Sequence, residues 1–349
     1  MENKNSQTIN ISTTTILKLL LIFLIIVFLY LIKEVIASIF ISLVLASAFD
    51  PWVDWFQKRK IPRGVAIIII YLLLFAIIST TIVLIVPPIT KEIGQIAKNF
   101  PYYYDKVIHG INYFKGVAPA RLETELQQGI DSLSSSLPGA ITNIFSTVFG
   151  FFGGIISFFL VLVITFYFTV EEEGLKSFIR AVSPSKIQPY INQLMFRIQR
   201  KMGLWLRGQL ILSLIIFALV FIGLSILGVQ YALLLALIAG LLEVIPFLGP
   251  TLAAIPAVFF GFLQSPLTGI FVIALYIIIQ QLENHIIVPK VMGKTVGLNP
   301  LVVIVVILVG AKLGGVVGAL LSVPVATGVS VFLSDFFEKK INTELKLEE

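Results

Sequence analysis

Long runs of apolar residues alternate along the chain with polar segments. Residues 16–32 and 65–86 are nearly continuous apolar stretches, each close to the length of about 20 residues that a helix needs to cross a bilayer. Neither run shows the alternation of apolar and polar residues that marks a strand of an outer-membrane barrel. Similar runs recur to the C-terminal end, so the pattern predicts an all-α, polytopic membrane protein with about eight transmembrane helices.

The first apolar region, residues 16–49, is interrupted near its middle by the adjacent charges Lys33 and Glu34. It has no small-residue cleavage site, so we interpret it as retained sequence rather than a signal peptide. One straight helix of this length would overshoot the hydrocarbon core, which favours a tight helical hairpin. Neither Gly nor Pro marks a turn, so a single long tilted helix is the alternative, and it would invert the orientation downstream.

The polar segments set the predicted orientation. The loop at 50–64 carries four basic residues and two tryptophans, so the positive-inside rule makes it cytoplasmic. The third apolar run ends at Pro87-Pro88, and residues 88–143 then carry apolar residues at helical spacing, Leu122, Leu126, Leu133 and Leu137 among them. This spacing predicts amphipathic helices outside the bilayer, which form either a solvated cap or an oligomerisation surface.

The predicted organisation has six parts. They are transmembrane helices 1–3 (residues 1–87), an extramembrane amphipathic region (88–143), transmembrane helix 4 (144–171), cytoplasmic amphipathic helices (172–204), a C-terminal core of helices 5–8 (205–338) and a cytoplasmic tail (339–349). Eight crossings place both termini in the cytoplasm.

Two apolar segments of the C-terminal half are too long for one crossing. Residues 231–263 contain Glu243, Gly249 and three prolines, Pro246, Pro250 and Pro256. Residues 301–337 contain Lys312, Gly314, Gly315 and Pro324. We therefore expect broken or re-entrant segments near 246–256 and 310–324.

Helix breaks at membrane depth indicate where chemistry can occur. The main-chain groups freed at a break persist only when buried in protein or facing water, and transporters use such helix ends to hold ions and charged solutes. The predicted transport site comprises the residues of the two breaks named above together with Asn284 and His285; secondary candidates are Arg207, Gln209 and Glu283. Each charge also has a simpler interpretation: Glu243 could be solvated at the interface, Lys312 could snorkel to water, and Arg207 could be a topology anchor.

Composition excludes several other classes of protein. The chain is 58% hydrophobic and 13% charged, with a mean hydropathy of +1.01 and a net charge of +6. Its basic residues collect in short loops, so they indicate membrane topology rather than nucleic-acid binding. It has no cysteine, and the adjacent Glu283, Asn284 and His285 point to different sides of a helix. No motif for nucleotide binding or hydrolysis is present, so we expect a non-enzyme without metal or cofactor.

Several motifs resemble the autoinducer-2 exporter family of bacterial permeases. They are IPRG at 61–64, GVQYA at 228–232, LLEVIPFLGPTLAAIPA at 241–257, NHIIVPKVMGKTVGLNP from Asn284 and GGVVGALLSVPVA from Gly314. The resemblance implies eight transmembrane helices in the bacterial inner membrane, homo-oligomers, described as pentamers, and export of a small polar signalling molecule. Some members are described as sodium/proton antiporters. Phe247 stands where the family often has a tyrosine, so a hydroxyl ligand is absent there.

Three functions follow as hypotheses. The main one is a secondary transporter that alternates access to a polar site at the breaks, with Glu243 as the coupling or ligand-binding charge. The second is a monovalent cation/proton antiporter in which Glu243 titrates. The third is a non-transporting membrane scaffold. The sequence leaves the substrate, the direction of transport and the coupling ion open.

Overall fold

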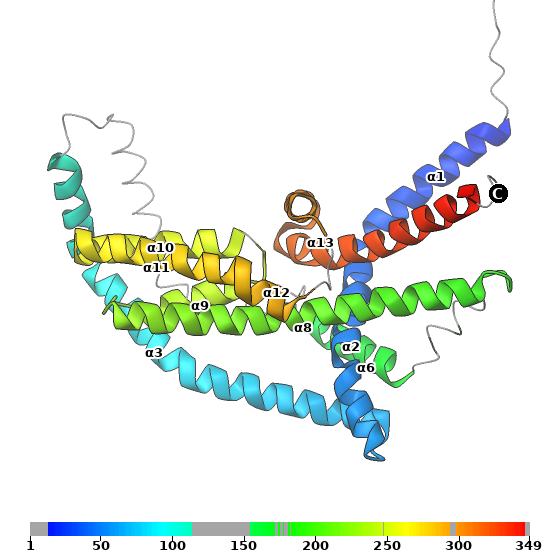
Figure 1. Ribbon diagram of the computed structural model, residues 1–349, viewed down its shortest axis with the longest axis horizontal. Coiled ribbons are helices and arrows are strands. Elements are labelled where there is room, and N and C mark those ends of the chain that lie inside the picture. Colours follow the sequence, from blue (N-terminus) through cyan, green and yellow to red (C-terminus); the bar gives the residue numbers. More distant parts are fainter. Residues whose placement is uncertain are drawn as a thin grey trace, which may run out of the picture.

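The chain is a helical membrane protein (Figure 1). The computed structural model describes residues 13–113, 154–171, 183–246, 248–293 and 298–345, together with Gly174, Ser177 and Ala181. Every regular element in these residues is a helix. They are α1 (Thr13–Leu31), α2 (Lys33–Lys58), α3 (Arg63–Tyr113), α6 (Ile155–Val170), α8 (Gln188–Ile226), α9 (Ala232–Leu242), α10 (Leu248–Gln264), α11 (Pro266–Leu282), the π-helix η1 (Glu283–Ile287), α12 (Val288–Val291) and α13 (Pro300–Leu345).

Six of the described helical segments are long and apolar enough to cross a membrane. Three shorter apolar helices, within α6, α9 and α10, accompany them. The prediction of a polytopic helical membrane protein is therefore confirmed. The predicted amphipathic positions Leu122, Leu126, Leu133 and Leu137 lie outside the described residues.

The N-terminal apolar region does not form the tight hairpin expected from its length. Helix α1 leads directly into α2, because the N–H of Ile32 donates to Phe28 O and the N–H of Ile36 donates to Ile32 O. The two helices meet end to end at a bend and do not lie side by side (Figure 1). No residue of α1 is buried in the chain. Without Gly or Pro at positions 32–34, nothing forces the backbone to reverse.

Two predicted boundaries fall inside continuous helices. The third span was expected to stop at Pro87-Pro88, but α3 runs through both prolines to Tyr113. The amphipathic segment after Pro189 and the fifth span are one 39-residue helix, α8. Proline at the first turn of α8 is favourable because its missing N–H has no helical partner there. One continuous helix, α8, therefore contains residues from both sides of position 205, where a cytoplasmic helix and the C-terminal core were expected to meet.

Helix α8 is the axis on which the C-terminal helices pack. It runs the length of the molecule, with α9, α10 and α11 along one half and the second part of α13 along the other (Figure 1). Leu212, Ile216, Val220 and Leu224 are buried at intervals of four residues, so they form one face of the helix. This face packs into the largest apolar cluster, together with residues of α9, α10 and α11.

Helix α2 crosses α8 in a close backbone contact. An added Cβ at Gly203 of α8 would lie 2.2 Å from the Ser47 carbonyl oxygen. Helix α6 packs on α2, where the Ser42 hydroxyl of α2 donates to the Val161 carbonyl oxygen of α6 at 3.1 Å. Arg63, at the start of α3, pairs with Asp50 and Asp54 of α2 at 3.5 and 3.1 Å. The contact at Gly203 joins the N-terminal helices to the C-terminal core, and the other contacts join α2 to α6 and α3.

Candidate transport site at the break between α9 and α10

The first predicted break lies between Leu242 and Leu248. Pro246 ends α9 because its ring would clash with the Leu242 carbonyl, four residues earlier, and because the residue before a proline avoids helical geometry. Pro250 lies in the first turn of α10, where its missing N–H has no helical partner. Pro256 lies inside α10, which continues to Gln264. The break therefore begins at Glu243, three residues before the predicted segment 246–256, and α10 begins again at Leu248.

The chain reverses at this break and forms a hairpin. An added Cβ at Gly249 would lie 2.1 Å from the Leu242 carbonyl oxygen and 2.8 Å from the Glu243 nitrogen, so the start of α10 touches the end of α9. Helices α9 and α10 pack against each other. With 11 residues, α9 is about 16 Å long at 1.5 Å per residue. That is roughly half of the hydrocarbon core, which is the geometry of a re-entrant segment.

The carboxyl group of Glu243 lies at the tip of this hairpin and is fully buried, with 0% of the residue exposed. Glu243 is also the C-cap residue of α9. Gln209 of α8, 1% exposed, donates its side-chain N–H to the Glu243 backbone carbonyl at 2.5 Å. This bond holds the tip against the middle of α8. Because the Gln209 side-chain amide donates to the Glu243 main-chain carbonyl, this bond does not involve the Glu243 carboxyl group.

A second buried carboxyl group lies near enough to interact electrostatically with Glu243. It belongs to Glu283, which is 4% exposed. Glu283 is the first residue of η1, the π-helical turn that follows α11. A π-helical turn changes the direction of the side chains that follow it, and such turns are frequent at functional sites. Here Glu283 points into the protein, while the next two residues remain exposed.

Several oxygen atoms around the tip are buried without a hydrogen-bond partner among the described residues. Ser213 lies four residues after Gln209 on α8. It faces α9, because a Cβ added at Gly240 of α9 would lie 3.1 Å from the Ser213 backbone oxygen. The unpaired atoms are Oε1 and Oε2 of Glu243, Oε2 of Glu283, Oε1 of Gln209 and Oγ of Ser213. Buried polar atoms are normally paired. This group of oxygens is therefore a candidate binding site for a cargo or coupling ion.

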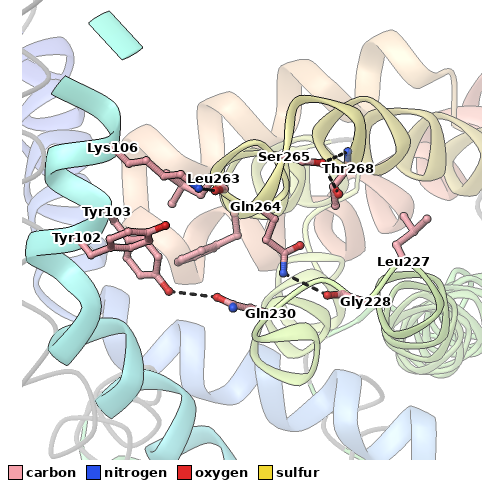
Figure 2. A pocket seen from close by; sticks show the side chains of 11 residues that line it. Tyr102, Tyr103, Lys106, Leu227, Gly228, Gln230, Leu263, Gln264, Ser265 and Thr268 are labelled. Carbon is pink, nitrogen blue, oxygen red and sulfur yellow. Dashed lines mark hydrogen bonds between the residues drawn. The ribbon is translucent and has the colours of Figure 1, made fainter. Parts of the chain in front are cut away.

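The base of the hairpin lies at the opposite end and borders a pocket of about 420 Å³ (Figure 2). Its walls come from α3, from the turn before α9, and from the junction of α10 and α11. The Tyr103 hydroxyl lies 2.8 Å from the Tyr231 hydroxyl and 3.2 Å from Gln230 Oε1. Tyr103 lies beyond the apolar span of α3, which ends at Ile96. Burial and the contact with Tyr231 raise the pKa of Tyr103 to about 12, so its hydroxyl keeps its proton at neutral pH.

Helix α3 also anchors the hairpin. The Leu234 N–H, in the first turn of α9, donates to Glu92 Oε2 at 2.9 Å. A carboxylate at this position satisfies one of the unpaired N–H groups of the helix start and complements its dipole. Lys106 donates to the Leu263 carbonyl near the end of α10. Both arms of the hairpin are thus attached to α3 at the base, while the tip is attached to α8.

The second predicted break lies at Gly314 and Gly315, where α13 has non-helical backbone angles. An added Cβ at Gly310 would lie 2.3 Å from the Gly318 carbonyl oxygen, so the two arms touch close to the turn. In Figure 1 the first arm, in orange, is seen nearly end-on, whereas the second runs across the view. Pro324 lies inside the second arm and is buried. The break is shorter than the segment predicted.

The two breaks are neighbours in the structure. Ile245, from the tip of the α9–α10 hairpin, packs on a cluster that contains Trp205 of α8 and both arms of α13. The turn of α13 itself is exposed, as are Lys312, Gly314 and Gly315. The packing therefore joins the hairpin tip to the arms of α13 but not to Lys312.

The remaining predicted residues lie around this centre. Asn284 and His285 are exposed, and His285 Nδ1 lies 3.0 Å from the Gln281 carbonyl oxygen. Arg207 donates to the Gly203 carbonyl at 3.0 Å and interacts electrostatically with Asp50 of α2. The structure thus brings together Glu243, Gln209 and Glu283 and leaves the other polar candidates outside the buried group.

Sequence reasoning did not single out Ser213 or Glu92. Ser213 follows Gln209 by one helical turn on α8, and this spacing is the only signal in the sequence that could have placed it beside the site. Nothing local marks Glu92 as the partner of a helix start 142 residues away.

Helices long and apolar enough to cross a membrane, a hairpin with a buried polar tip and a second interrupted helix beside it are typical of a multi-pass membrane transporter. The family model described as "AI-2E family transporter" matches residues 18–338. The chain therefore belongs to the AI-2E transporter family.

Relatives cover most of the chain. It is 28% identical to the "Putative transport protein YueF" of Bacillus subtilis, over 90% of this chain and 89% of the relative. It is 24% identical to the "Putative transport protein YrrI" of the same organism, with 88% of each covered. It is 25% identical to a "Sodium-lithium/proton antiporter" of Halobacillus andaensis, over 84% of this chain and 87% of the relative.

Proposed function

We propose that the chain is a secondary transporter in which the α9–α10 hairpin gates a polar site centred on Glu243. The observation that carries the proposal is the fully buried Glu243 carboxyl group, which has no hydrogen-bond partner among the described residues. A buried charge without a partner is strongly destabilising. A protein keeps such a group within the membrane when a ligand, ion or proton neutralises it during function.

Alternating access follows from how the hairpin is attached. The tip depends on one Gln209 hydrogen bond and on apolar packing through Ile245. The base is tied to α3 by the Glu92 contact. A hinge at the base would let the tip leave α8 and expose Glu243 to one side of the membrane. Movement of broken helices against a fixed bundle is a common mechanism of secondary transporters.

The proposed cargo is a small polar solute, and the proposed direction is export. The resemblance to autoinducer-2 exporters supports an autoinducer-2-like molecule. The unpaired oxygens around the tip would accept hydrogen bonds from the hydroxyl groups of such a solute. The proposed location is the bacterial inner membrane with the C-terminus cytoplasmic, and the proposed assembly is a homo-oligomer, a pentamer by resemblance. A transporter that acts in this way is not an enzyme and needs no cofactor.

A monovalent cation/proton antiporter is the second candidate. Two observations favour it: the proximity of two buried carboxyl groups, Glu243 and Glu283, and the similarity to the Halobacillus protein. The two candidates share the same site and differ in whether an organic solute moves with the ion. A non-transporting scaffold is the remaining alternative, and it would not depend on the buried carboxyl groups.

Flux measurements with Glu243→Gln test the proposal. The protein is reconstituted in liposomes, and efflux of labelled autoinducer-2 is followed under proton and sodium gradients. We expect wild-type efflux and a loss of at least about tenfold in Glu243→Gln, since removing one charge from a buried site typically costs more than 1.4 kcal/mol. Glu34→Gln, at an exposed position of α2, is the matched control and should transport normally.

Two other outcomes distinguish the alternatives. Sodium-dependent proton flux without solute movement, lost in Glu243→Gln, would favour the antiporter. Wild-type flux of both solute and protons in Glu243→Gln would remove the Glu243 carboxyl group from the mechanism.

A further inference from the structure

The pocket at the base of the hairpin has the position and the charge of a lipid headgroup site. We propose that it binds the phosphate headgroup of an anionic phospholipid, with Lys106 as the charged contact. A lipid held there would connect α3 to the turn before α9 and to the junction of α10 and α11. Such a site would exist whether or not the hairpin moves, because it lies at the base and not at the buried tip.

The pocket lies where a membrane surface is expected. Helices α8 and α10 end beside it and α11 begins beside it, and the apolar span of α3 ends at Ile96, before the pocket residues of that helix. Tyr102 and Lys106 are exposed there, with Lys106 Nζ 5.5 Å from the centroid of the Tyr102 ring. Tyrosine is enriched at the interface between membrane and water, and lysine can extend its charged end to that level. A phospholipid headgroup would therefore lie at the depth of this pocket.

The charge of the pocket favours an anion. Lys106 is the only charged side chain among the described residues that line it, and none of them is acidic. The ammonium group has three N–H donors, and its contact with the Leu263 carbonyl uses one of them. The start of α11 adds the partial positive charge of a helix N-terminus. Basic pockets between membrane helices are typical sites for anionic headgroups.

Two side-chain amides supply neutral hydrogen bonds. The Tyr103 hydroxyl donates to Gln230 Oε1 at 3.2 Å, which leaves the N–H₂ group of Gln230 as a donor. Gln264 donates to the Gly228 carbonyl at 3.2 Å, which leaves its Oε1 as an acceptor. Both amides and Lys106 lie around the same pocket, although they come from three different segments (Figure 2). Phosphate oxygens would accept from Lys106 and Gln230, and a headgroup hydroxyl would donate to Gln264.

Apolar surface next to the pocket favours a lipid over a soluble anion. Leu227 and Leu263 line the pocket, and Ile226 and Leu267, which are neighbours of lining residues in the chain, are exposed. The pocket volume of about 420 Å³ is typical of a site for a small molecule, so it has room for a headgroup while the acyl chains remain outside. Acyl chains would cover the exposed apolar side chains, whereas free phosphate would leave them uncovered.

Binding of radiolabelled short-chain phosphatidylglycerol to the purified full-length protein in a neutral detergent tests the site. We expect saturable binding, with at least about fivefold weaker binding in Lys106→Gln, since one lysine beside an anionic lipid contributes about that factor. Gln230→Leu should weaken binding by a smaller factor, because it removes a neutral donor. Lys91→Gln is the matched control, at an exposed position of the same helix outside the pocket, and it should bind as wild type.

Competition on the wild-type protein identifies the source of the phosphate. Zwitterionic phosphatidylcholine with the same acyl chains should displace the label at least about fivefold less well than unlabelled phosphatidylglycerol, because it has no net charge. Inorganic phosphate at the same concentration should not displace it. Equal displacement by the two lipids would overturn the preference for an anion, and displacement by inorganic phosphate would overturn the assignment to a lipid.

Two variants separate the base of the hairpin from its tip. Size-exclusion profiles and thermal unfolding show whether each variant is folded, and if Lys106→Gln fails to fold, the lipid competition on the wild type still tests the site. Wild-type affinity for phosphatidylglycerol in folded Lys106→Gln would overturn the inference. Glu243→Gln should bind the lipid as wild type does, and loss of binding in that folded variant would overturn the assignment to the base.

Discussion

Gly249 shows how one residue permits the hairpin. The start of α10 lies directly on the last carbonyl of α9, and the space for a Cβ is occupied by the backbone of Leu242 and Glu243. Backbone atoms cannot move aside as a flexible side chain can. A larger residue would therefore separate the two arms and shift Glu243 away from Gln209.

We predict that Gly249→Ala destabilises the protein by about 2 kcal/mol or more, since overpacking a close contact typically costs 1–3 kcal/mol. The midpoint of thermal unfolding in detergent should fall clearly. Gly94→Ala is the matched control, because Gly94 lies in helix α3 with no atom within 4 Å of an added Cβ; its stability should be unchanged or slightly higher. Equal midpoints for both variants would contradict the close contact at the hairpin tip.

The residues of the site were predictable only in part. Glu243 and the prolines contrast with the apolar run around them, so the sequence alone identifies them as candidates. The direction in which Glu283, Asn284 and His285 point depends on the π-helical turn, which has no signature in their composition. Partners such as Ser213 and Glu92 come from tertiary packing between helices and cannot be inferred from local spacing.

At the scale of elements, two interrupted helices meet at α8. Overlong apolar segments with Pro and Gly predicted both interruptions, because a continuous helix would not fit the bilayer. Residues 16–49 do not form the tight hairpin, and the helix ends expected at Pro87-Pro88 and near residue 205 lie inside the continuous helices α3 and α8. Proline in a long helix is compatible with continuation when neighbouring groups satisfy the freed carbonyls, so proline alone does not locate a helix end.

At the α13 break, the cost of an unusual backbone conformation can be measured without a change in side-chain packing. Gly315 has φ 61° and ψ −142°, whereas Gly314 has φ −135° and ψ 18°; neither has an atom within 4 Å of an added Cβ. We predict that Gly315→Ala costs about 1–3 kcal/mol from backbone strain and that Gly314→Ala costs less. Thermal unfolding of the two variants measures the difference. Equal costs would show that the turn does not require the conformation seen at Gly315.

At the scale of the whole molecule, α3 and α8 connect the two ends of the core. Arg63 at the start of α3 pairs with Asp50 and Asp54 in the last part of α2, and the later part of α3 reaches the pocket at the hairpin base. The two regions therefore lie at opposite ends of α3. The positive-inside rule, applied to the basic residues near Lys58, predicts that the first end faces the cytoplasm.

This orientation can be measured with single cysteines, since the natural chain has none. We predict that a membrane-impermeant maleimide labels Gln230→Cys in intact cells and labels Lys58→Cys only after permeabilisation. Both positions are exposed, so labelling reports sidedness rather than burial. The reverse pattern would place the hairpin base in the cytoplasm and invert the direction of transport proposed above.

The shallow reach of α9 has an electrical consequence. With the base of α9 at the edge of the hydrocarbon core, its 11 residues would place the tip roughly halfway through that core, and an ion travelling from either side to Glu243 would fall through part of the transmembrane voltage. A full crossing is worth about 2.3 kcal/mol per charge at 100 mV. Half of that drop would change cation occupancy roughly sevenfold. The resting potential of the cell would then act directly on how often the carrier is loaded.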